Sequence, residues 1–388
     1  MSSANMTPDS VPPGTEDPDA GTGDAGGAEG APTPRRRRWW LWGMAGVLVL
    51  GAVLGALFVP TPYVLIQPGA VRPAEERIEV TGAPSYDNDG DVLFTTVFVD
   101  RATLFGLLRG SLDDAIEVRT QQEVYGDRSR DETKEINRQQ MDLSKLVATI
   151  EALDQLGYDA SFTADGARVL DVDGDADAAG EIRPGDVIVA VDGVAVALPA
   201  DLRAALGDRA PGDAVTVSVQ RPVPPSGESA APEGGDMEAV EVETVLSSAD
   251  DDGRAVLGVN VEPWKPRVES EVDVEIDSGA VTGPSAGLAW SLAVIDALTP
   301  GSLTGERDVA VTGEITADGS VGVIGGVTQK AATVARNGVD VFLYPADTSE
   351  EEQEEMRRIA GDDVELVPVD SLAEAVEYLA PEGLPAPG

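Results

Sequence analysis

The chain of 388 residues contains no histidine and no cysteine. A serine hydrolase normally borrows a histidine as the base that activates its nucleophile, and a thiol enzyme needs a cysteine. Both classes are therefore excluded, together with zinc sites built on histidine. Lysine is scarce as well, because only Lys134, Lys145, Lys265 and Lys330 occur. If a serine is a nucleophile here, its base must be a lysine or a carboxylate.

Signatures of cofactor and metal binding are also missing. The phosphate-binding run Gly-x-x-x-x-Gly-Lys-Ser/Thr does not occur, and no glycine is followed by lysine. Residues 171–177 look like the start of an EF-hand loop, but Ala176 replaces its glycine and Ile182 stands at its final glutamate position. We therefore expect no cofactor and no metal. The formal net charge of −43 repels phosphates, so nucleic acid is not expected as a partner.

Ser285 is the candidate nucleophile. It lies in residues 283–287, Gly-Pro-Ser-Ala-Gly, directly before an apolar run that ends at residue 298. This run has the length and composition of one buried helix, and Pro284 fits a turn or the first helical position. Ser285 is thus placed near a helix N-terminus, where free N–H groups favour a developing oxyanion. The alternative is a serine that merely caps a core helix.

Lys330 is the candidate base. Residues 326–338 predict a helix that ends at Gly338. On this helix Val327, Lys330, Ala331 and Val334 fall at i, i+3, i+4 and i+7, so the lysine lies on the apolar stripe. One interpretation is a lysine that extends to the surface. The other is a desolvated amine whose pKa is lowered enough for it to act as a base.

Residues 281–345 resemble the proteolytic domain of the Lon family, which uses a Ser-Lys dyad. The resemblance rests on residues 283–287 and on the linked runs 311–316 and 324–330. It implies that Ser285 is the nucleophile, Lys330 the general base and Thr312 a hydrogen-bonding neighbour of the lysine amine. Val281 and Thr282 depart from the family pattern, since many relatives carry a charged or acidic residue there. The ATPase of the energy-driven members is absent from this sequence, so ATP-independent cleavage is expected.

The N-terminal part predicts a membrane anchor. Residues 1–34 are rich in small and acidic residues, lack lysine and arginine, and should be a disordered cytoplasmic tail. Arg35 to Arg38 follow, and then residues 39–59 form an uncharged run of 21 residues that begins with tryptophans. That run is long enough to span a bilayer, and the arginines should stay cytoplasmic. The alternatives are a cleaved signal peptide or a core helix. Absence of cysteine suits an extracytoplasmic location.

Three further segments complete the predicted organisation. Residues 62–160 show strand patterns and then a helix over 143–156. Residues 163–248 resemble a PDZ domain, which implies binding of extended peptides or C-terminal tails, with a carboxylate loop near residues 165–167. The alternative for this unit is a packing spacer. Residues 222–237 predict an exposed loop, and residues 250–388 carry the predicted catalytic part.

The expected fold is an α/β (α+β) Lon-type proteolytic domain, residues 62–160 and 250–388, interrupted by the PDZ-like β-rich unit and preceded by one transmembrane helix. The expected function is that of an ATP-independent, membrane-anchored serine endopeptidase of envelope or unfolded proteins. Its expected partners are protein or peptide substrates, membrane lipid through residues 39–59, and further copies of the chain in a homo-oligomer. The alternative is a catalytically idle PDZ-containing adaptor or scaffold of the cell envelope.

Overall fold

The computed structural model describes residues 36–223, 235–249, 253–305 and 307–385. It divides into two compact units, residues 1–55 and 56–388. The first unit holds most of α1 (Arg36–Phe58), in which residues Trp39–Leu57 have a mean hydropathy of 2.0 and none is buried. This helix is long and apolar enough to cross a membrane. The predicted disordered tail, residues 1–34, lies outside the described residues.

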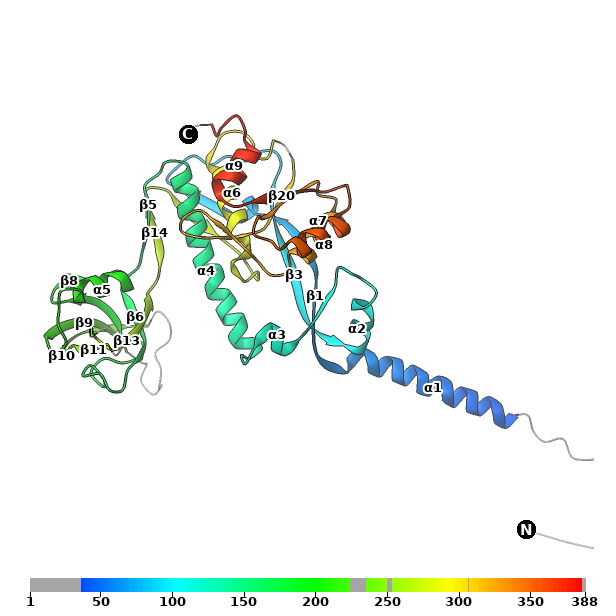
Figure 1. The fold of residues 1–388 in the computed structure, drawn as a ribbon, viewed down its shortest axis with the longest axis horizontal. Coiled ribbons are helices and arrows are strands. Elements are labelled where there is room, and N and C mark those ends of the chain that lie inside the picture. The colour runs from blue at the N-terminus through cyan, green and yellow to red at the C-terminus, as the bar shows by residue number, and fades with distance from the viewer. Residues whose placement is uncertain (1–35, 224–234, 250–252, 306, 386–388) are drawn as a thin grey trace, which may run out of the picture. The chain divides into compact units, whose positions relative to one another are not determined.

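A six-stranded mixed sheet forms the centre of the second unit, in the order β20-β19-β16-β3-β1-β4 (Figure 1). The strands β1, β3 and β4 pair antiparallel, whereas β16 runs parallel to both β3 and β19, and β19 runs parallel to β20. The bounds are β1 (Pro60–Pro73), β3 (Val92–Thr103), β4 (Glu117–Thr120), β16 (Val309–Val311), β19 (Val341–Pro345) and β20 (Glu365–Val369). Strands from before and after the PDZ-like unit therefore share one sheet.

Helices cover both faces of this sheet. Successive strand residues point to opposite faces, so Val92 and Phe94 of β3 join one core cluster and Leu93 joins the other. On the first face lie α6 (Gly287–Leu298), α4 (Arg130–Gln155) and α9 (Leu372–Leu379); on the second lie α7 (Val327–Asn337) and α8 (Glu350–Ala360).

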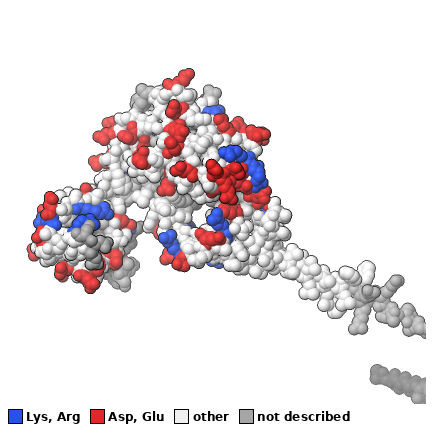
Figure 2. All heavy atoms as spheres, viewed as in Figure 1, with Lys and Arg blue, Asp and Glu red and all other residues white. Residues whose placement is uncertain are grey.

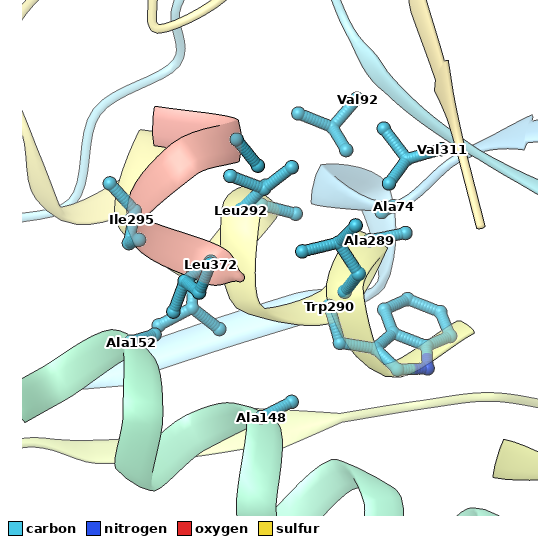
Figure 3. Close-up of a cluster of buried hydrophobic side chains, with 14 of the residues drawn as sticks. Ala74, Val92, Ala148, Ala152, Ala289, Trp290, Leu292, Ile295, Val311 and Leu372 are labelled. Atoms are coloured by element: carbon cyan, nitrogen blue, oxygen red, sulfur yellow. The ribbon is translucent and has the colours of Figure 1, made fainter. Parts of the chain in front are cut away.

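Every residue of α6 is buried, which agrees with its predicted role as a core helix. Its side chains meet alanines of α4 and Leu372 of α9 in one cluster (Figure 3). Trp290 packs against Phe94 with ring centroids 4.9 Å apart. Since each fully buried leucine or isoleucine stabilises the fold by about 1.5–3 kcal/mol, this helix is a major part of the core.

The helix predicted over 143–156 is longer than expected, because α4 begins at Arg130. Its first three turns are polar and mostly exposed, so no apolar stripe marks them. A capping box does mark the start: the Ser129 side chain accepts from the Glu132 N–H, and the Glu132 carboxylate accepts from the Ser129 N–H.

The PDZ-like unit is a second sheet in the order β10-β9-β7-β6-β13, with β8 (Val194–Ala195) paired to β7. Its strands are β6 (Ala167–Val172), β7 (Val187–Val191), β9 (Ala214–Pro222), β10 (Met237–Val245) and β13 (Val259–Pro263). The helix α5 (Pro199–Leu206) packs on it, with Leu202 and Leu206 in its core. β13 lies beyond the predicted end of this unit at residue 248. The predicted loop over 222–237 lies mostly outside the described residues.

A two-stranded ribbon joins the PDZ-like unit to the rest of the chain. β5 (Ala160–Thr163) pairs with β14 (Arg267–Ser270), and Arg267 stands opposite Thr163. The same register continues into the β6–β13 pair, where Pro263 stands opposite Ala167. The chain thus leaves and returns at neighbouring positions.

Short elements fill the connections. They are the 3-10 helices Glu75–Arg77 and Pro284–Ala286, α2 (Leu104–Gly110), α3 (Gln121–Tyr125), β2 (Ile78–Thr81), β11 (Ser247–Ser248), β12 (Ala255–Val256), β15 (Asp273–Ile276), β17 (Glu314–Ile315) and β18 (Val321–Gly322).

Candidate active site

The turn that carries Ser285 is held by α4. Ser285 lies in the 3-10 helix Pro284–Ala286, immediately before α6, as the sequence predicts. Gly283 has φ 93°, which favours glycine, and its N–H donates to the Asn137 carbonyl at 2.8 Å. The Ser144 hydroxyl donates to the Pro284 carbonyl at 3.1 Å. Two residues of the segment before the PDZ-like unit therefore position the candidate nucleophile.

The connection between β16 and β17 holds the same turn from the other side. The Ser285 carbonyl accepts from the Gly313 N–H at 3.0 Å and from the Thr312 hydroxyl at 3.0 Å. The Leu288 N–H donates back to the Gly313 carbonyl at 3.1 Å. These bonds fix the backbone of Ser285, so its side chain projects from a rigid turn.

Lys330 reaches this turn from the buried face of α7. Gly326, with φ 72°, begins the helix, and Gly338, with φ 70°, ends it where the sequence predicts. The Lys330 side chain is only 2% exposed, so it does not extend to the surface. Its Nζ donates to Ser285 Oγ at 2.7 Å and to Thr312 Oγ1 at 2.8 Å. The three predicted site residues are thus brought together, and Thr312 bonds to both of the others.

Burial lowers the pKa of Lys330 from 10.5 to about 7. The cause is desolvation, which disfavours the charged ammonium form. Among the described ion pairs none includes Lys330, so no carboxylate holds the amine in its charged form. Near neutral pH Lys330 is therefore neutral in a large fraction of the molecules and can accept a proton. The hydroxyls that it contacts are those of Ser285 and Thr312.

The contacts of α4 are what the sequence reasoning missed. Asn137 lies in the polar first half of α4, which was not predicted to be helical, and Ser144 lies in the predicted half. The capping box Ser129-x-x-Glu132 could have extended the predicted helix. Nothing local in the sequence indicates that this helix contacts residues 283 and 284. Within the described ranges, no three Asp or Glu side chains converge on a point that could hold a metal ion.

A separate hollow of about 830 Å³ lies in the PDZ-like unit, between α5 and β13. Leu202 and Leu206 of α5 line one side, and residues 253–261 line the other. Residues 165–167, the predicted carboxylate loop, do not line it in the part of the chain that the structure describes. Gly258, with φ 72°, turns the chain into β13, and a Cβ there would lie 2.4 Å from the Ala176 Cβ. Gly258, directly before β13, is the sequence signal that could have indicated the turn into this strand.

Comparison with known proteins finds two domain families in this chain. Residues 255–381 match the Lon protease C-terminal proteolytic domain, and residues 152–244 match the PDZ domain. The Lon protease of Elusimicrobium minutum is 34% identical over 119 residues, 30% of this chain and 14% of that protein. The Lon protease of Trichlorobacter lovleyi is 36% identical over 121 residues, 31% of this chain and 14% of that protein. The matched region thus spans about a seventh of these relatives.

Among solved structures, the PDZ domain of an SdrC-like protein from Listeria innocua is 25% identical, with a TM-score of 0.20. It covers 25% of this chain, and the match takes in 93% of that structure. The family matches show that the chain carries a Lon-type proteolytic domain and a PDZ domain, the two that the sequence predicts.

Proposed function

We propose that this chain, with its Lon-type proteolytic domain and PDZ domain, is a serine endopeptidase that works through a Ser285–Lys330 dyad. One observation carries the proposal: the Lys330 Nζ lies 2.7 Å from Ser285 Oγ, and burial lowers the pKa of that amine to about 7. A base is most effective when its pKa is near the working pH. In a chain without histidine, this amine is the group that meets both conditions.

The reaction has two halves. Neutral Lys330 takes the hydroxyl proton of Ser285 as Oγ attacks the peptide carbonyl carbon, and the tetrahedral intermediate collapses as the ammonium returns the proton to the leaving amine. Water then attacks the resulting ester, and Lys330 takes the proton of the water and returns it to Ser285. Thr312 orients the amine. The N-terminus of α6 directly follows Ser285, and the positive end of its helix dipole favours the developing oxyanion.

The test is hydrolysis of an unstructured fluorogenic peptide by the full chain in detergent. Ser285→Ala and Lys330→Arg are expected to abolish cleavage, since arginine stays protonated at any working pH. The matched controls are Lys134→Arg, Lys145→Arg and Lys265→Arg, which should keep nearly full activity. In the wild type the rate should rise with pH through about 7, because only the neutral amine is a base. Robust cleavage by folded Lys330→Arg would exclude the dyad.

We further propose that α1 anchors the protein as a single-pass membrane protein, with residue 1 in the cytoplasm and residue 388 outside. The support is the apolar span Trp39–Leu57 and the four arginines before it. Its substrates would then be envelope or unfolded proteins, cleaved without ATP. Protease added to cells with permeabilised walls should digest the C-terminal part, and protection of that part would contradict this topology.

The PDZ domain is proposed to present substrate. Among the described strands, β13 is the edge strand of its sheet: it pairs with β6 on one side and with no strand on the other. It also lines the 830 Å³ hollow. An extended peptide can therefore add as a strand to β13. The same feature supports a second candidate, an idle adaptor that binds peptides but does not cleave them. Labelling of Ser285 by a fluorophosphonate probe distinguishes the two, because an idle site would not react.

A further inference from the structure

An exposed apolar face lies on α2 and on the turn that follows it. Leu104, Phe105, Leu108 and Leu112 are 50%, 50%, 57% and 78% exposed. At 100° per residue Leu104, Phe105 and Leu108 fall on one side of the helix, and Leu112 lies in the turn after it. Single exposed leucines are ordinary, but a contiguous apolar stripe of this kind indicates a surface that something covers.

Glycines explain why α2 presents this face. A Cβ on Gly106 would lie 2.8 Å from the Leu65 Cδ1, and a Cβ on Gly110 would lie 2.7 Å from the Val118 Cγ2. Leu107 packs into the small cluster between α2 and the sheet. The side of α2 that faces the sheet therefore consists of two glycines and one leucine, which pack closely against β1 and β4. The larger side chains are left on the outward side, so their exposure follows from the packing.

This face lies next to the end of the candidate membrane span. The span ends at Leu57, and β1 begins three residues later at Pro60. In the β1–β3 pair Pro60 stands opposite Thr103, the N-cap of α2. The N-cap of α2 therefore lies beside Pro60, two residues after the last residue of α1.

An arginine-lined hollow of about 680 Å³ lies in the same region. Arg101, Arg128 and Arg130 line it, together with the start of α4. The hollow lies close to the end of the candidate span. The Gln121 side chain, which is part of its lining, donates to the carbonyl of Thr61 at 3.1 Å, and Thr61 follows the span by four residues. Figure 2 shows Lys and Arg side chains interspersed with Asp and Glu over α3 and the start of α4, whereas the surface over α2 carries almost no charge in this view.

One acidic residue, Asp131, is part of the lining of the hollow, and the carboxylates of its neighbours in the chain take part in other hydrogen bonds. The carboxylates of Glu123 and Glu132 accept from the backbone N–H groups of their own helix caps, and the Asp127 carboxylate accepts from Gln122. Asp131 is exposed at the rim and lines the hollow. Three arginines thus line the hollow together with one acidic residue, Asp131, in a chain whose net charge is −43. Guanidinium groups suit phosphate oxygens in particular.

We propose that α2 lies in the interfacial layer of an anionic phospholipid bilayer, with its leucines and Phe105 among the acyl chains and a lipid phosphate in the hollow lined by Arg101, Arg128 and Arg130. Apolar side chains beside basic ones are what such a layer binds. The continuity with the span favours lipid over a second copy of the chain, because residues a few positions from the bilayer meet its surface in every copy. The inference rests on the proposed anchoring by α1.

The absence of cysteine permits a direct test, because a single introduced cysteine is labelled alone. The full chain is labelled with NBD at Leu108→Cys and placed in nanodiscs that contain phosphatidylcholine with roughly one third phosphatidylglycerol and a doxyl-labelled lipid. NBD at Leu108→Cys should be quenched several-fold more than NBD at Glu354→Cys, an exposed site on α8. NBD at Val47→Cys within α1 should be quenched whether or not α2 touches lipid.

Each outcome is decisive. Quenching at residue 47 without quenching at residue 108 overturns the inference and leaves the anchoring intact. Lack of quenching at both overturns the anchoring itself. A signal at residue 108 that needs two chains per disc shows that a second copy covers the face, which also overturns the inference.

A separate experiment tests whether the three arginines bind the lipid phosphate. Omitting phosphatidylglycerol should weaken the quenching at residue 108, and the combined change Arg101→Gln, Arg128→Gln and Arg130→Gln should remove that dependence on anionic lipid. The matched control removes the same charge elsewhere, by Arg203→Gln, Arg267→Gln and Arg357→Gln. In this control the quenching should still depend on anionic lipid. Equal dependence in both triple variants would exclude the hollow as the lipid site.

Discussion

A buried lysine is costly to the protein that holds it. Folding lowers the pKa of the Lys330 amine from 10.5 to about 7, so the unfolded chain binds a proton that the folded chain releases between these values. At about 1.4 kcal/mol per pKa unit, this costs on the order of 4 kcal/mol near pH 7. Its hydrogen bonds to Ser285 and Thr312 offset about 1 kcal/mol each. The amine is thus better suited to proton transfer than to stability.

Lys330→Met should therefore make the protein more stable, by about 2 kcal/mol near neutral pH. The gain should shrink as pH rises from about 7 towards 10, because the unfolded wild-type chain then loses its proton as well. Thermal unfolding of the full chain in detergent at a series of pH values measures this. Lys134→Met, on the exposed side of α4, serves as control and should show no such trend. A destabilised Lys330→Met at every pH would contradict the argument.

The candidate dyad could be predicted from the sequence because each residue has a local signal. Ser285 stands in a small-residue turn before an apolar helix, and Lys330 stands on an apolar stripe. The low pKa could only be expected in direction, since its size depends on how completely the side chain is buried. Asn137 could not be predicted, because its role is a backbone contact with a residue far away in the chain.

At the scale of elements, the close approach of α4 to the start of α6 sets the nucleophile turn. Gly287 makes the approach possible: a Cβ there would lie 2.8 Å from the Ser144 Oγ and 2.9 Å from the Ile315 N. The backbone atom cannot move aside, so a larger residue has to push the turn. The sequence places Gly287 in the motif, but the reason for the glycine is visible only in the packing of two helices.

Gly287→Ala should lower the free energy of unfolding by about 1–3 kcal/mol. It should also reduce peptide hydrolysis, by up to about a hundredfold if the turn shifts by 1 Å. Denaturant unfolding and the fluorogenic assay measure the two effects. Gly325→Ala is the control, because a Cβ there meets nothing within 4 Å. Full activity in Gly287→Ala would show that the turn is more tolerant than its contacts indicate.

At the scale of the molecule, the ribbon of β5 and β14 offers a place to remove the PDZ domain. Arg267 stands opposite Thr163, so an Asn-Gly turn between them would close a hairpin. Deleting residues 164–266 in this way also removes β13, which a cut at residue 248 would leave without its partner β6. The sequence predicted a PDZ domain inside a discontinuous protease domain. It could not show that β13 pairs with β6, because register between distant strands has no local signal.

The hairpin variant should still cleave the small unstructured peptide at a rate close to that of the wild type, because Ser285, Thr312 and Lys330 lie outside the deletion. It should lose preference among longer protein substrates if the PDZ domain presents them. A soluble, folded variant that no longer reacts with the fluorophosphonate probe would count against this division of roles.

The shared sheet also sets the order in which the chain can assemble. β3 and β16 are neighbours, yet Asp91 and Asp308 at their starts are 217 positions apart. A PDZ domain that folds first brings Thr163 beside Arg267 and removes about half of that loop, which is worth only about 0.6 kcal/mol of closure entropy. The insertion therefore costs the host little. Aggregation during synthesis is the greater hazard. Until residues 309–311 have been synthesised, the edge of β3 that pairs with β16 stays unpaired and can pair with other chains.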